Sequence, residues 1–190
     1  SQLIVTPIST GQKITDRGFI IEASDLIYVS IRMEAGGAQA GALVSKGLSA
    51  LGTEFRVGSY TNENPQNNYL NFVSVMATED GTNVTFDNLP AGLIIEHYSG
   101  AFPINTTLKK GESFTIATNS FVNIINRDGL IGTLVKSDKP IVVSCGSANG
   151  SFHNGGGRDY GIDQIVGADK IGNEYIFVRG FGSDGWENVL

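Results

Sequence analysis

Apolar and polar residues alternate over short stretches of this chain, which is the pattern of β-strands with one buried face. The clearest stretches are 72–78 and 83–87, and the Asp80-Gly81 sequence between them suits a hairpin turn because glycine adopts positive φ angles freely. Further strands are predicted at 19–23, 26–31, 54–60, 93–98, 104–108, 113–118, 122–126, 131–136, 141–145 and 174–179. Strands spaced this closely are typical of sandwiches, barrels and propellers.

Helical periodicity is rare in the sequence. The one stretch compatible with a helix is 42–51, and Gly47 inside it and Gly52 after it favour a short turn instead. Two glycine-rich segments, 35–41 and 146–161, are predicted to be loops. We therefore predict an all-β fold, a β-sandwich, with a propeller-like arrangement of four-stranded sheets as the alternative.

An internal repeat is the most informative feature of the sequence. LGTEF at 51–55 recurs as IGNEY at 171–175, and residues 21–30 match residues 135–144. Each copy has the order strand, Ser-Asp turn, strand, glycine-rich loop, and strand beginning with Gly-x-Glu-aromatic, so we predict a duplicated unit of about 115–120 residues. The positions expected to serve the architecture of the repeat are Gly52, Glu54, Gly172, Glu174, Ser24, Asp25, Ser137 and Asp138.

The repeat also predicts how the chain is divided. Residues 1–57 are expected to be the end of a first β-repeat, 58–178 a complete β-repeat and 179–190 the start of a further one, as in a fragment of a longer protein. Repeated β-units of this kind bury their apolar faces by packing on their neighbours.

Charge and composition narrow the function classes. Thirteen Lys and Arg against nineteen Asp and Glu give a net charge of −6, so nucleic acid and anionic membranes are not expected partners. A single cysteine, Cys145, excludes an internal disulfide, and two histidines leave little for a transition-metal site. The apolar runs are far shorter than the roughly 20 residues that span a bilayer, so no membrane insertion is expected.

Three motifs in a set order carry a family resemblance. ATEDGTNV at 77–84, LKKGESF at 108–114 and SDKPI at 137–141 resemble the IgGFc-binding protein N-terminal domain family, and the likeness extends from about Ile20 to Leu190. The resemblance implies a non-enzymatic, extracellular β-rich module, as in animal mucus-associated proteins and large bacterial surface proteins of the gliding-motility and adhesin type. The sequence lacks the several cysteines of the animal members, which points to the bacterial branch and away from antibody Fc binding.

Candidate binding residues gather in and after the second glycine-rich segment. Asparagine, histidine, arginine and aromatic side chains can hydrogen-bond or stack on a ligand, and the candidates of this kind are Asn149, His153, Asn154, Arg158, Tyr160 and Trp186. Calcium is a possible cofactor at Asp159 and Asp163, because carboxylate oxygens in loops are calcium ligands. A Cys145–His153 catalytic pair is conceivable, but a lone cysteine is more often a small buried hydrophobe.

These observations predict a module of a large bacterial surface protein rather than an enzyme. Its expected role is adhesion or surface and filament assembly, with a protein or glycan, copies of itself or neighbouring domains as partners. Two alternatives are a self-associating structural subunit without a ligand site and a carbohydrate-binding module.

Overall fold

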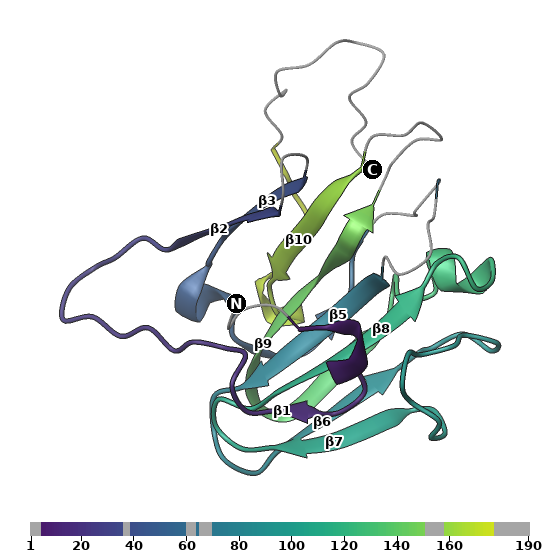
Figure 1. Ribbon diagram of the computed structural model, residues 1–190. Helices are drawn as coiled ribbons and strands as arrows, with labels where there is room; N and C mark the ends of the chain where they lie inside the picture. Colours follow the sequence, from purple (N-terminus) through teal and green to yellow (C-terminus); the bar gives the residue numbers. More distant parts are fainter. Residues whose placement is uncertain (1–4, 36–38, 60–63, 65–69, 151–157, 177–190) are drawn as a thin grey trace.

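The computed structural model describes residues 5–35, 39–59, 64, 70–150 and 158–176 (Figure 1). In these residues the regular elements are β-strands and short 3₁₀ helices, so the all-β prediction is confirmed. In chain order they are η1 (Pro7–Ser9), β1 (Lys13–Ile14), β2 (Ser30–Ala35), β3 (Gln39–Val44), η2 (Gly47–Ala50), β4 (Gly52–Arg56), β5 (Leu70–Ala77), β6 (Thr82–Asp87), β7 (Ile104–Leu108), β8 (Ser113–Asn119), η3 (Ile125–Arg127), β9 (Leu134–Gly150), β10 (Asp159–Ile165) and η4 (Ala168–Lys170).

The long strand β9 organises the main sheet. Its first residues pair with β6 on one edge and β4 on the other, and its later residues pair with β5 and β10. The strand order is β1-β8-β5-β9-β6-β7, and all of these pairings are antiparallel. Pro140, which cannot donate to a ladder, lies where the β6 pairing has ended at Ser137 and the β5 pairing begins at Ile141.

The main sheet folds over on itself around one core. Phe86 of β6 and Phe114 of β8 have ring centroids 6.0 Å apart, although β5 and β9 separate their strands in the sheet order. The inward side chains of both halves meet in this core, which includes Val73, Val75, Val84, Phe86, Phe114, Ile116, Val135, Ile141 and Val143. This folded sheet is sandwich-like, and the described residues contain no set of four-stranded blades as in the propeller alternative.

A two-stranded sheet, β2–β3, packs on β10. The backbone N–H of Ala40 donates to Asp159 Oδ1 at 3.1 Å, and the N–H of Lys46 donates to Gln164 Oε1 at 2.6 Å. Gly41 lies against Tyr160, and a Cβ on Gly41 would be 2.5 Å from the Tyr160 ring. Close approach of the backbone, rather than loop flexibility, therefore explains this glycine.

The two glycine-rich segments predicted to be loops, 35–41 and 146–161, are partly β-strand. β2 continues to Ala35 and β3 begins at Gln39, while β9 continues to Gly150 and β10 begins at Asp159. Glycine is required inside this ladder because a Cβ on Gly146 would lie 1.9 Å from the Gly161 carbonyl oxygen.

Several predicted strands are wrong. Residues 19–23 and 26–29 are not strands but part of an extended segment, residues 15–29, which we call the arm. The stretch 93–98 is a series of turns, because His97 has a φ of 55° and the alternating Leu93 and Ile95 face the core without a ladder. Residues 122–126 form a turn and the start of η3, the predicted strand 174–179 has no strand at 174–176, and its last three residues lie outside the described part.

The Asp80-Gly81 turn joins strands that do not pair with each other. Gly81 has the expected positive φ of 65°, but β5 and β6 follow one another along the same edge of β9, with Ala77 opposite Ile141 and Val84 opposite Ser137. The hairpin prediction is therefore wrong, although the turn itself is correctly placed.

The sequence repeat corresponds to two hairpins with the same register. The pair Ser30–Val44 in β2–β3 corresponds to Ser144–Gln164 in β9–β10, and Met33–Gly41 corresponds to Ser147–Gly161. A 3₁₀ helix follows each hairpin. β4, the last strand of the first copy, then pairs with β9 of the second copy.

In the described part of the chain, no helix has the length and hydropathy of a membrane span.

Candidate functional site

One end of the main sheet gathers most of the buried polar side chains. At this end β8 finishes opposite the start of β5, with Leu70 facing Asn119, and β9 finishes opposite the start of β10, with Gly150 facing Asp159 (Figure 1). We call it the loop end. The buried polar residues here are Asn71, Thr118, Asn119, Ser120, Asn126, Ser147 and Asn149.

Hydrogen bonds connect five of these residues and nearby backbone groups into a network, namely Asn71, Thr118, Asn119, Ser120 and Asn126. Asn71 Nδ2 donates to Ser120 Oγ at 2.8 Å and to the Arg127 carbonyl at 2.9 Å. Asn126 Nδ2 donates to the Asn119 carbonyl at 3.1 Å, and Thr118 Oγ1 donates to the Asn126 carbonyl at 3.0 Å. Buried hydrogen-bond networks of this kind hold the loops that contain them in one arrangement.

The network supports a loop that presents apolar side chains to solvent. Phe121 is 63% exposed and Ile124 is 69% exposed, and Val122 between them is exposed as well. We call these three residues the apolar tip. Asn119 Oδ1 accepts from the Phe121 N–H at 3.0 Å, and the Asn119 carbonyl accepts from the Val122 N–H at 3.1 Å. The tip is thus a set of large apolar groups on a well-supported loop, which is a common form of protein-binding surface.

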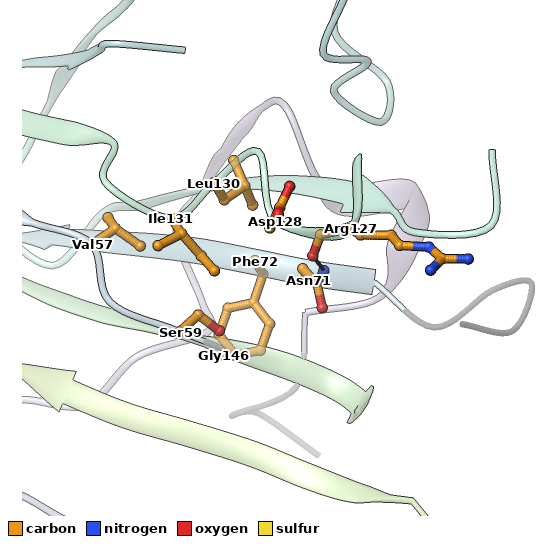
Figure 2. Close-up of a pocket in the computed structure, with 9 residues that line it drawn as sticks. All are labelled: Val57, Ser59, Asn71, Phe72, Arg127, Asp128, Leu130, Ile131 and Gly146. Atoms are coloured by element: carbon orange, nitrogen blue, oxygen red, sulfur yellow. Dashed lines mark hydrogen bonds between the residues drawn. The ribbon is translucent and has the colours of Figure 1, made fainter. Parts of the chain in front are cut away.

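A small cavity of about 10 Å³ lies next to Asn71 of the network, and Arg127, Asp128, Leu130 and Ile131 line it from the segment that follows Asn126 (Figure 2). Two of its lining residues, Asn71 and Ser59, have buried oxygen atoms, Oδ1 and Oγ, that find no hydrogen-bond partner in the described part of the chain. A volume near 10 Å³ with polar atoms around it suits one water molecule. Figure 2 shows the Arg127 side chain pointing away from Asn71, so the backbone of Arg127 serves the network and its guanidinium does not.

The described members of the predicted ligand set lie near one another at the loop end. Asn149 is buried, and its Oδ1 has no hydrogen-bond partner among the described residues. The Arg158 guanidinium donates to the Asn64 carbonyl from Nε at 3.0 Å and from Nη2 at 2.9 Å. Tyr160 stacks on Phe72 with ring centroids 6.2 Å apart, and burial raises the pKa of Tyr160. The other members, His153, Asn154 and Trp186, lie outside the described residues.

The two predicted calcium ligands are not brought to one point. Asp159 and Asp163 are four residues apart on β10, which separates them by about 13 Å along a strand. Asp159 accepts from Ala40, and Asp163 forms a 2.8 Å ion pair with Lys46. In the part of the chain that the structure describes, no group of three or more His, Cys, Asp and Glu side chains could hold a metal ion.

Cys145 is a buried residue of β9. Burial raises the pKa of its thiol to about 12, and Sγ lies 2.8 Å from the Gly58 carbonyl, to which it donates. A thiol with this pKa stays protonated at neutral pH and is a poor nucleophile. His153, the other half of the conceivable pair, lies outside the described residues.

The repeat positions have different environments in the two copies. Asp138 accepts from the backbone and side-chain amides of Asn83 in β6 at 2.8 and 2.7 Å, whereas Asp25 accepts from its neighbour Leu26. Ser137 Oγ donates to the Lys139 carbonyl, and Ser24 is exposed in the arm.

The glycine and glutamate positions differ in the same way. A Cβ on Gly52 would be 2.9 Å from Gly167 Cα, but one on Gly172 would meet nothing nearer than 3.7 Å. Glu54 is exposed in β4 opposite Lys136, and Glu174 is exposed. Among the described residues, the structural role of Glu54 is its cross-strand position opposite Lys136.

The apolar tip is the feature that sequence reasoning missed. Val122 and Ile124 lie two positions apart, so they fall in the strand predicted at 122–126, while Phe121 directly before it belongs to no predicted element. Asparagine at 119, 123 and 126 was the available signal, because asparagine side chains cap turns in the way that Asn119 and Asn123 do here.

Comparison with known proteins adds one match. Residues 40–189 match the model of a protein family described as IgGFc binding protein. No curated protein and no solved structure matches the chain.

Proposed function

We propose, from the premise that this chain belongs to the IgGFc binding protein family, that it is a non-enzymatic extracellular module that binds another protein. Within that class, the proposed role is adhesion or surface assembly as part of a large bacterial surface protein, with a surface protein or its glycans as the partner. The family description supports protein binding. The lack of the cysteines of the animal members supports the bacterial setting rather than Fc as the ligand.

The apolar tip is the observation that carries the binding proposal. Binding energy at protein interfaces is concentrated in a few large apolar or aromatic side chains, and it is greatest where they are held before the partner arrives. Phe121 and Ile124 are such side chains, and the Asn71, Asn119 and Asn126 network supplies the support.

A self-associating structural subunit is the second candidate function. The arm favours it, because its large apolar side chains are exposed and such surfaces are commonly covered by a partner. These side chains are Phe19, Ile20, Ile21, Leu26, Ile27 and Tyr28. For a carbohydrate-binding module the described residues offer less support, since one face of the Tyr160 ring is stacked on Phe72.

The test is binding of the chain to two purified probes, a mucin glycoprotein and an IgG Fc fragment, by biolayer interferometry. We expect binding to the mucin and a loss of about ten-fold or more in affinity for the Phe121→Ser/Ile124→Ser variant. Leu48→Ser, an exposed leucine in η2, is the matched control and should bind like the unmodified chain. Binding to Fc alone would reverse the ligand assignment, and equal binding by the tip variant would remove the tip from the site.

A further inference from the structure

The pairing of β4 with β9 joins the two copies of the sequence repeat. Phe55 of β4 faces Val135 of β9, and both are completely buried. On the other face of the sheet Glu54 is opposite Lys136, and the two side chains are exposed and of opposite charge. A strand from one repeat copy therefore completes the sheet of the next copy.

The sequence duplicate of β4 has no such partner in the described residues. Residues 172–176 repeat the β4 pattern, with Glu174 at the position of Glu54 and Tyr175 at that of Phe55. Tyr175 is 63% exposed where Phe55 is fully buried, and Ile176 is exposed too. The one described contact of the Tyr175 hydroxyl is local, since it accepts from the Gly172 N–H at 3.2 Å.

We propose that residues 172–176 are an interaction strand that pairs antiparallel with a β9-type strand of a neighbouring domain. The partner strand has two consecutive aliphatic residues followed by a lysine, as in Leu134-Val135-Lys136. By the register of β4 on β9, its lysine faces Glu174 and its central aliphatic residue packs against Tyr175. Backbone hydrogen bonds supply affinity, and these two side-chain pairs supply specificity.

Charge selects this partner over the arm of a second copy. The arm also has two consecutive aliphatic residues followed by a charged one, Ile20, Ile21 and Glu22, so a partner strand formed by these residues would be acidic where β9 has Lys136. Glu22 would then face Glu174, and like charges directly opposite one another destabilise a strand pair. The sequence of β9 itself is therefore the better ligand.

This inference is independent of the proposed function. The interaction strand is residues 172–176, whereas ligand binding was assigned to Phe121, Val122 and Ile124. Loss of one activity leaves the other measurable, and the tip variant serves as a control for the strand experiment.

The experiment uses the whole chain and a fluorescein-labelled peptide with the sequence of residues 132–142, GTLVKSDKPIV, followed by fluorescence anisotropy. We expect saturable binding, about five-fold weaker for the peptide with Lys136→Glu. Tyr175→Ser in the chain should weaken binding about ten-fold or more. Tyr28→Ser, an exposed tyrosine of the arm, is the matched control and should leave the affinity unchanged. Absence of binding, or equal binding by the Tyr175→Ser chain, would overturn the proposal.

Light scattering coupled to size-exclusion chromatography tests whether the partner of residues 172–176 is instead a second copy of this chain. We expect no concentration-dependent association that depends on Tyr175. Dimers or longer assemblies that Tyr175→Ser abolishes, and that Glu22→Lys strengthens, would overturn the partner assignment in favour of a second copy of this chain.

Discussion

Ile27 and Ile141 occupy the same position in the two copies of the repeat, yet Ile141 is fully buried and Ile27 is 56% exposed. Ile141 belongs to β9, which has a neighbouring strand on each edge and the folded sheet beneath it. Ile27 belongs to the arm, which has neither. The comparison shows that an apolar strand pattern specifies a face that can be buried, while the neighbouring strands decide whether it is.

The largest effect on the free energy of unfolding is expected from truncating the buried one of these two isoleucines. Ile141→Ala removes buried methyl groups from the core and should lower the free energy of unfolding by about 3 kcal/mol. Ile27→Ala should change it by less than about 0.5 kcal/mol, as for other surface positions. Urea denaturation followed by circular dichroism measures both. Equal effects would mean that the arm is packed as closely as β9.

A smaller effect is expected from the cross-strand charge pair. Lys136→Glu places like charges opposite one another in β4 and β9 and should lower the free energy of unfolding by about 0.5–1 kcal/mol. The reverse change in the partner, Glu54→Lys, should restore most of this loss in the double variant. Glu22→Lys, a charge reversal in the exposed arm, should have no effect on urea denaturation. A loss that Glu54→Lys does not restore would exclude a direct charge interaction.

The smallest expected effect is on the pH dependence of the melting temperature, which should differ between variants of Asp138 and of Asp25, the aspartates of the two Ser-Asp turns. Hydrogen bonds from the Asn83 backbone and side chain lower the pKa of Asp138 below its ordinary value of 3.8. Because the pKa is lower in the folded state, the carboxylate stabilises the fold above about pH 4, and this contribution is lost as the pH falls through the folded-state pKa. Asp138→Asn should therefore reduce the change in melting temperature between pH 5 and pH 2.

The control for this prediction is Asp25→Asn. Asp25 contacts its neighbour Leu26 in the arm and joins no second strand, so this variant should melt like the unmodified chain at each pH. A pH profile that Asp138→Asn leaves unchanged would show that the Asp138–Asn83 contact does not stabilise the fold.

Part of the candidate site could be predicted from the sequence. Asn149, Arg158 and Tyr160, which the sequence groups around one glycine-rich segment, lie near one another at the loop end, and their role in binding stays a prediction. The apolar tip could not, because its exposure depends on Asn71, which is 50 residues away from Phe121 and holds Ser120 and Arg127 in place.

The sequence by itself determined the all-β class, the four strands that became β5 to β8 to within two residues, and the turn at Gly81. Alternation and turn residues are local properties, so they can be read without knowing the fold. The sequence repeat likewise identified two related segments.

Only the tertiary structure decided that β5 and β6 line one edge of β9 instead of forming a hairpin, and that Ile141 of one repeat copy is core while Ile27 of the other is exposed. Every strand offers the same backbone donors and acceptors, and an apolar face does not specify what covers it. Pairing and burial are settled between residues far apart in the chain, such as Phe55 and Val135, and these contacts have no local signal.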